Sequence, residues 1–309
     1  GANRFTVCPL WPLGNPSISH ASLVSADYFT VQIGDCGSTA GIGFQRAEGV
    51  TDVGFKYLKD TILGKQLADY IYTWTGGDLS ALNYGIFDAD PTSIQADVLA
   101  MVGDSKEQIS ELLPSYGFGI LRDGQTGRVH TLRDVWMTFG IKASHAHADK
   151  LNLGMAAFGL NIVPELGYPT NTGTNARRSQ WEFSTIAHNT VVVDQKSQDG
   201  NISFAGTDPY LFDDSDVVKV LGVDASDAYS TTDIYNRTVV MIKANEDVSY
   251  YVDFFRVLGG SNHTFSFHAQ SHNVSAVEGL EMIAQVDADG NYVGSYAGAD
   301  THPDRKSVV

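Results

Sequence analysis

Two histidines and an aspartate alternate in the segment His145-Ala-His147-Ala-Asp149, which lies between apolar stretches typical of β-strands. Alternate side chains of a strand point to the same face, so the sequence predicts that these three groups face one direction. Imidazole and carboxylate groups transfer protons and bind divalent cations. Three such groups on one face would make a poor hydrophobic core, and the spacing therefore indicates a functional site.

Two later segments carry residues that complete a metal-ligand set. Glu165 ends the apolar segment that begins at Asn161, and His188 precedes the very apolar run from Thr190 to Asp194. Two histidines and one carboxylate are an ordinary ligand set for zinc or a related divalent cation. We therefore predict that His147, Glu165 and His188 bind such an ion, with water or Asp149 completing its coordination.

Each of these residues also has a simpler interpretation. A single histidine at the start of a strand, such as His188, is most often structural, and a glutamate at a strand end, such as Glu165, is most often solvated. Asp149 could cap a turn or orient an imidazole without binding the ion itself. The pair of histidines two residues apart favours a site over these interpretations. Among the other histidines, His268 is slightly favoured because it ends an alternating strand.

The elements that must position these residues fall into two parts. Helical spacing of apolar residues predicts a helix over 53–74 and a second over 94–101, with a third ending at Pro114. After Pro114, short apolar or alternating segments are separated by Asp, Asn and Gly at short intervals, which is typical of an antiparallel sandwich. We expect an α+β, mainly β protein: a short helical and loop region over 1–114, then a large antiparallel multi-sheet β-sandwich over 115–309.

Composition excludes some partners and leaves others open. The net charge of −16 argues against a broad nucleic-acid or membrane-surface footprint, because both need clustered cations. The chain has no apolar run of about 18 residues, so no membrane span is expected. A local cationic cluster can still bind an anionic ligand, and Arg177 and Arg178 are candidates because guanidinium pairs with carboxylate or sulfate. Trp181 could stack on a sugar or pack in the core.

A resemblance follows from these motifs taken together. The string from His145 to Leu151, the Gly-Tyr at 167–168 and the Ala-His-Asn-Thr run at 187–190 resemble the heparinase II/III-like family of polysaccharide lyases. The similarity continues in order to Tyr296. It implies the end of an incomplete α/α-toroid followed by the β-sandwich. It also implies cleavage of an anionic, uronic-acid-containing polysaccharide, such as alginate or a glycosaminoglycan, by β-elimination.

The resemblance also implies residue roles. His145 corresponds to a histidine that faces the substrate cleft, and it is our candidate catalytic residue. His147, Glu165 and His188 correspond to ligands of a structural metal, for which zinc is the expected ion; relatives often have Asp in place of Glu165. No organic cofactor is expected. Relatives take a carboxylate-neutralising Asn or His and a catalytic Tyr from the toroid, so we expect a missing N-terminal toroid segment or a second chain to supply them. The family implies a secreted or periplasmic enzyme, although the chain shows no signal peptide.

Two other functions remain open from the sequence. Cupin-like metalloenzymes also place His-x-His on a strand, but they require a glutamate a few residues after the second histidine. This chain has Leu151, Asn152 and Leu153 there. A non-catalytic carbohydrate-binding or structural sandwich with a structural metal would also fit, because a complete set of lyase residues is not found in the sequence.

Overall fold

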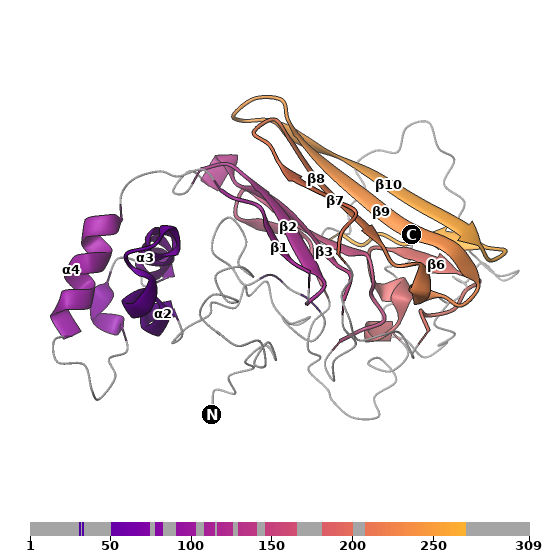
Figure 1. Cartoon of the computed structure of the whole chain (residues 1–309), viewed down its shortest axis with the longest axis horizontal. Helices are drawn as coiled ribbons and strands as arrows, with labels where there is room; N and C mark the ends of the chain where they lie inside the picture. Colours follow the sequence, from indigo (N-terminus) through magenta and orange to yellow (C-terminus); the bar gives the residue numbers. More distant parts are fainter. Residues whose placement is uncertain are drawn as a thin grey trace, which may run out of the picture.

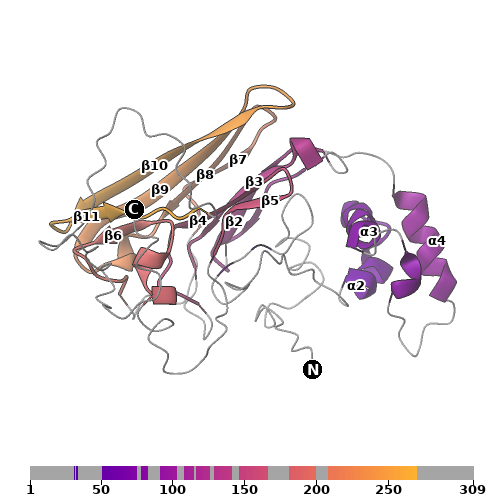
Figure 2. The ribbon, with the colours of Figure 1, turned by 180° about the vertical axis from the view of Figure 1, so that it is seen from behind.

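A computed structural model of the chain describes residues 31, 33, 51–74, 78–82, 91–102, 108–114, 116–125, 129–140, 146–165, 181–199 and 208–269. Along these residues, helices come first and antiparallel sheets follow, with the helices grouped at one end of the molecule (Figure 1; Figure 2 from behind). This order confirms the predicted fold class, a mainly β protein with a short helical part before a sandwich.

The helical part has a small core of its own. Its elements are α2 (Thr51–Leu58), α3 (Ile62–Trp74), the 3-10 turn η1 (Leu79–Ala81) and α4 (Pro91–Met101). Phe55, Leu67, Ile71 and Val98 are buried together between them. None of the described helices is long and apolar enough to cross a lipid bilayer.

The predicted helix over 53–74 is in fact two helices. The amide and the hydroxyl of Thr61 both donate to the carbonyl of Leu58, which ends α2 and starts a turn. The two helices then approach so closely that a Cβ on Gly64 would lie 2.4 Å from the Leu58 carbonyl oxygen. Apolar spacing continues through this turn, so periodicity could not reveal the break.

The strands form three antiparallel sheets within the described residues. A five-stranded sheet has the order β1-β2-β3-β4-β5, a four-stranded sheet the order β10-β9-β8-β7, and β11 pairs with β6. The bounds are β1 (Glu111–Leu113), β2 (Phe118–Asp123), β3 (Arg133–Thr138), β4 (Asn152–Ala157), β5 (Leu160–Val163), β6 (Val191–Val193), β7 (Leu211–Asp214), β8 (Val218–Asp224), β9 (Thr232–Lys243), β10 (Ser249–Gly259) and β11 (His263–Phe265).

Several predicted elements differ from the structure. The helix predicted to end at Pro114 is wrong, because residues 111–113 form β1 and pair with β2. Pairing with a buried neighbour thus outweighs local propensity. The expectation that the histidine motif lies on a strand is also wrong for its described part, since residues 146–150 form a loop between β3 and β4. The predicted domain boundary at residue 114 stays a prediction.

The main core lies between the five-stranded and four-stranded sheets. Val135 and Leu153 from the first sheet pack with Leu221 and Val239 from the second. The other face of the five-stranded sheet is covered too, where Trp136 and Phe118 pack with Val31 and Ile33. Because both faces are buried, β2 and β3 are buried at every position, so their sequences show no apolar–polar alternation.

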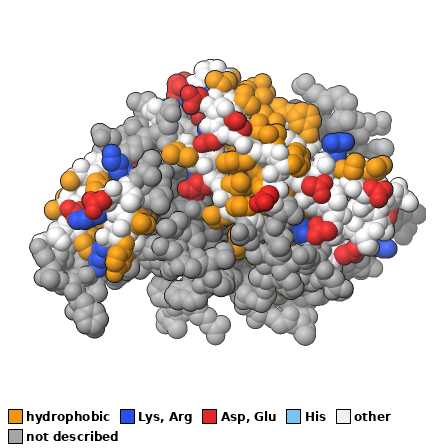
Figure 3. Space-filling view, viewed as in Figure 1, with side chains coloured by type: hydrophobic (Ala, Val, Ile, Leu, Met, Phe, Trp, Pro, Cys, Tyr) orange, Lys and Arg blue, Asp and Glu red, His pale blue; other side chains and the backbone are white. Residues whose placement is uncertain are grey.

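The four-stranded sheet turns its other face outward. Figure 3 shows hydrophobic side chains, in orange, on the surface over this sheet. Several large apolar residues in and beside its strands are exposed. They include Tyr210, Val218, Tyr250, Phe254 and Leu258. This exposed face explains why β9 and β10, unlike β2 and β3, show partial burial along their lengths.

One arginine ties the four-stranded sheet to the loops beside the five-stranded sheet. Arg237 of β9 is fully buried, and its guanidinium Nε and Nη2 donate to the two carboxylate oxygens of Asp253 at 2.9 and 2.6 Å. Its Nη1 donates to the carbonyl of Leu151 at 2.6 Å and to that of Asn189 at 2.5 Å. The guanidinium also lies 5.1 Å from the ring centroid of Phe255. A single side chain thus fixes two segments that are distant in sequence.

We predict that Arg237→Met lowers the free energy of unfolding by roughly 3–5 kcal/mol, because it deprives the carboxylate of Asp253 and two buried carbonyls of their charged donor. Urea denaturation followed by circular dichroism measures the change. Arg256→Met on β10 is the matched control, since Arg256 is exposed and should change stability little. Equal losses in the two variants would contradict this role for Arg237.

Candidate metal centre

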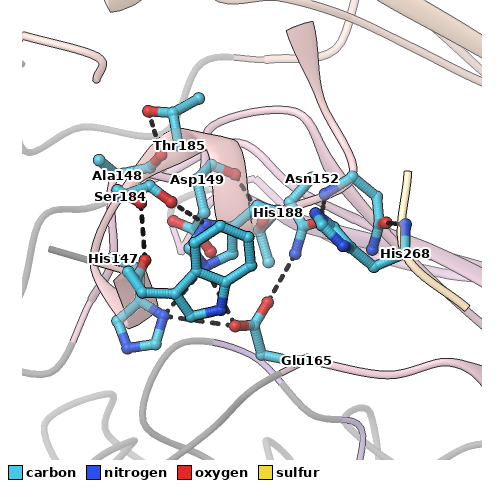
Figure 4. A network of polar contacts seen from close by, with 12 residues as sticks. His147, Ala148, Asp149, Asn152, Glu165, Ser184, Thr185, His188 and His268 are labelled. Atoms are coloured by element: carbon cyan, nitrogen blue, oxygen red, sulfur yellow. Dashed lines mark hydrogen bonds and ion pairs between the residues drawn. The ribbon is translucent and has the colours of Figure 1, made fainter. Parts of the chain in front are cut away.

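Three predicted ligands converge in the interior of the sandwich. His188 Nε2 lies 3.0 Å from Glu165 Oε1 and 3.0 Å from His147 Nδ1, and His147 Nδ1 lies 3.3 Å from the same glutamate oxygen. All three residues are buried, with 6% or less of each exposed. Figure 4 shows the three side chains pointing toward one another from separate segments. This His-Glu-His group could bind a metal ion.

Each ligand comes from a different connection. His147 lies in the loop between β3 and β4, Glu165 follows β5, and His188 follows the 3-10 turn η4 (Thr185–Ala187) just before β6. The loop turns into β4 at Leu151, whose φ of 62° is rare for a residue with a branched side chain. Two hydrogen bonds hold that conformation: the Leu151 amide donates to the carbonyl of Thr138, and the Leu151 carbonyl accepts from Arg237 Nη1.

The ring of His188 has a fixed proton arrangement. Its Nδ1 lies 2.8 Å from the carbonyl oxygen of Ser184, which can only accept, so Nδ1 carries the hydrogen. In the neutral ring, Nε2 then presents its lone pair to Glu165 and His147. This is the usual arrangement of a metal-binding histidine, in which the distal nitrogen donates to a carbonyl or carboxylate.

Side-chain hydrogen bonds hold the two histidine segments together. The hydroxyl of Thr185 donates to the carbonyl of Ala148 at 2.7 Å. The carboxamide of Gln198 pairs with both backbone groups of Lys150, accepting from its amide at 2.8 Å and donating to its carbonyl at 2.9 Å. The loop that carries His147 is therefore bound to the segment that carries His188 without any strand ladder between them.

The charged groups of the centre change one another's pKa. Burial alone would raise the pKa of Glu165, but the charge of His188 and hydrogen bonds from both histidines hold it well below its usual range. Burial would lower the pKa of His188, yet the neighbouring Glu165 carboxylate raises it overall. Burial, together with the charge of Glu165, raises the pKa of Asp149. A divalent ion bound here would displace protons from the histidines and neutralise the carboxylate in their place.

The spacing of the donor atoms fits a small divalent ion. Ligand bonds of about 2.0–2.1 Å in tetrahedral geometry place ligand atoms about 3.3 Å apart. The three separations between His147 Nδ1, Glu165 Oε1 and His188 Nε2 are 3.0, 3.0 and 3.3 Å. The donors are thus already at nearly the required separations. Asp149 is buried nearby, but its carboxylate is not among the converging donor atoms.

Several predicted site residues lie outside the described residues or in other surroundings. His145, Arg177 and Arg178 fall outside the part of the chain that the structure describes. Trp181 is 8% exposed, and its ring meets that of His268 edge-on at 5.8 Å. His268 Nε2 lies 2.9 Å from the carbonyl of Ile186, so this histidine braces η4.

Sequence reasoning missed the contribution of Asn152. Its Nδ2 donates to Glu165 Oε2 at 2.8 Å, and its Oδ1 accepts from the amide of Asn189 at 2.8 Å. An asparagine flanked by Leu151 and Leu153 at the start of a buried strand is the signal that could have revealed it. A buried amide needs partners for its polar atoms, so its presence there indicates a polar neighbour.

Comparison with known proteins places the sandwich in a family. Residues 106–304 match the family described as heparinase II/III-like, C-terminal. No match was found among curated proteins. Among solved structures, heparinase III (the BT4657 gene product) has a TM-score of 0.54 at 15% identity, covering 84% of this chain and 34% of that chain.

Two further structures are similar. The same heparinase with methylated lysines has a TM-score of 0.57 at 15% identity, again covering 84% of this chain and 34% of its own. Heparan sulfate lyase HepC from Pedobacter heparinus has a TM-score of 0.50 at 15% identity, covering 78% of this chain and 31% of that chain. The chain thus spans about a third of the length of these structures, and at this identity they show the shared fold alone.

We predict that the purified chain carries about one equivalent of divalent metal and that His188→Ala loses it, because the variant removes one of three ligands. Inductively coupled plasma mass spectrometry after dialysis measures the content. His130→Ala provides the matched control, since His130 is exposed in the turn η2 (Val129–Thr131). Equal metal content in wild type and His188→Ala would remove His188 from the ligand set.

Proposed function

Because the chain belongs to the heparinase II/III-like C-terminal family, we propose that it forms the β-sandwich part of a lyase that cleaves a uronic-acid-containing polysaccharide. The observation that carries this proposal is the buried His147–Glu165–His188 centre within the family's sandwich. The names of the similar structures, heparinase III and heparan sulfate lyase, support a sulfated glycosaminoglycan as substrate. Alginate is the second candidate polymer of the same chemical class.

The proposed reaction is a β-elimination. A base removes the proton at C5 of the uronate, the C5 electron pair forms a C4=C5 double bond, and the C4–O bond to the next sugar breaks. An acid then protonates the leaving oxygen. The C5 proton is acidic enough only when the adjacent carboxylate is neutralised by cations or hydrogen-bond donors.

His145 is the proposed proton-transfer or substrate-contacting residue. It precedes the proposed ligand His147 by two residues in the sequence. Arg177 and Arg178 are the proposed substrate contacts, through the anionic groups of the sugar. Trp181 was the third candidate, but its 8% exposure and its edge-on contact with His268 favour a packing role. The carboxylate-neutralising residue and the catalytic tyrosine would come from a toroid in a preceding segment or a second chain.

The proposed metal is zinc in a structural role. His147, Glu165 and His188 would hold it, and two nitrogens with one carboxylate oxygen suit zinc. All three ligands are buried, which argues against contact between the ion and a polymer. The same burial argues against a cupin-like metalloenzyme, whose ion must keep an accessible position for its substrate. A polymeric substrate of this class also favours a secreted or periplasmic location.

We predict that a polyuronide incubated with the protein gives a rise in absorbance at the unsaturated-uronate band. Heparan sulfate, chondroitin sulfate, hyaluronan and alginate should each be tested, with the chain itself and with any longer protein that its source encodes. His145→Ala should lower kcat by at least about 100-fold, because it removes a proton-transfer group, while His130→Ala should leave it unchanged.

If no polymer gives a rise in absorbance, the proposed lyase activity is contradicted. Retained binding of a polymer without any product would instead favour the non-catalytic carbohydrate-binding alternative.

A further inference from the structure

Asn152 contacts the oxygen of Glu165 that the histidines do not use. Glu165 Oε1 lies 3.0 Å from His188 Nε2 and 3.3 Å from His147 Nδ1, whereas Oε2 accepts from Asn152 Nδ2 at 2.8 Å. The two oxygens of one carboxylate therefore have different partners. Asn152 is 3% exposed, so water does not compete freely for this hydrogen bond.

The orientation of the Asn152 amide is fixed by a second hydrogen bond. Its Oδ1 accepts from the backbone amide of Asn189 at 2.8 Å. A flipped amide would place oxygen against Glu165 Oε2 and nitrogen against the Asn189 N–H, so both contacts would become repulsive. Asn189 is held in turn, because its Nδ2 donates to the carbonyl of Leu153 at 3.0 Å and its Oδ1 accepts from the amide of His268.

We propose that Asn152 is a positioning residue that makes Glu165 a one-oxygen ligand and couples it to His188. The proposal rests on the metal centre proposed above and goes beyond it in assigning how the centre selects its ion. With Oε2 held by an amide hydrogen, only Oε1 faces the histidine nitrogens. The backbone that Asn152 contacts on its other side belongs to the residue directly after His188.

This arrangement has a consequence for which ion is bound. A carboxylate that offers one oxygen suits a four-coordinate ion such as Zn²⁺. Ca²⁺ prefers six to eight oxygen ligands and often takes both oxygens of a carboxylate. Asn152 therefore favours Zn²⁺ over Ca²⁺, and its removal frees Oε2 to approach the ion.

The test compares the full chain with Asn152→Ala and Asn152→Leu, the second of which keeps the side-chain bulk. Zn²⁺ affinity is measured by competition with a chromophoric chelator, and Ca²⁺ by its ability to displace Zn²⁺. Both variants should bind Zn²⁺ about 10–100-fold more weakly. The visible spectrum of bound Co²⁺ should change from the intense bands of a four-coordinate ion toward weaker bands of higher coordination.

Asn236→Ala is the matched control, because this asparagine lies on β9 in the other sheet and its Oδ1 has no hydrogen-bond partner. It should keep the Zn²⁺ affinity and the Co²⁺ spectrum of the wild type. A wild-type spectrum in both Asn152 variants would overturn the positioning role while leaving the metal centre intact. An equal loss of Zn²⁺ affinity in Asn236→Ala would also overturn the positioning role of Asn152. A wild type that binds no ion would refute the metal centre itself, and this proposal with it.

Discussion

The buried guanidinium of Arg237 is the constraint on which the candidate site depends. Arg237 lies in the four-stranded sheet, and its Nη1 donates hydrogen bonds to the carbonyls of Leu151 and Asn189. Leu151 ends the loop that carries His147, and Asn189 directly follows His188. Asp253 neutralises the arginine from the neighbouring strand. Burying a charge without a partner costs several kcal/mol of desolvation free energy, which the pairing with Asp253 offsets. The hydrogen bonds of the same guanidinium also fix the separation of the two segments that carry His147 and His188.

The polar interior around the centre follows from this constraint. Segments that meet without a strand ladder must satisfy their backbone groups by other means. Gln198 pairs with the backbone of Lys150, and the hydroxyl of Tyr235 donates to the carbonyl of Val191 at 2.6 Å. Burial raises the pKa of Tyr235 to about 12, so this phenol serves as a neutral hydrogen-bond donor. These buried polar side chains fix the backbone of the segments that carry the two histidines.

The sequence predicted the ligand set and the fold class but not the way they are held. His147, Glu165 and His188 could be found because their side chains have distinctive chemistry and close spacing. Arg237 could not, since a buried arginine resembles a surface one until its partners are known, and Asn152 left only the weaker signal of an asparagine between two leucines. The strands β1 and β7 were missed because both are short and only partly buried. Their pairing is decided by tertiary contacts rather than by local pattern.

We propose that an ion joins His147, Glu165 and His188 inside the sandwich. Anomalous diffraction from crystals of the full chain, recorded on both sides of the zinc absorption edge, tests it most directly. One strong peak is expected within bonding distance of His147 Nδ1, Glu165 Oε1 and His188 Nε2, with Oε2 turned to Asn152. A zinc-loaded crystal with no peak at these residues, or with the ion bound elsewhere, would contradict it.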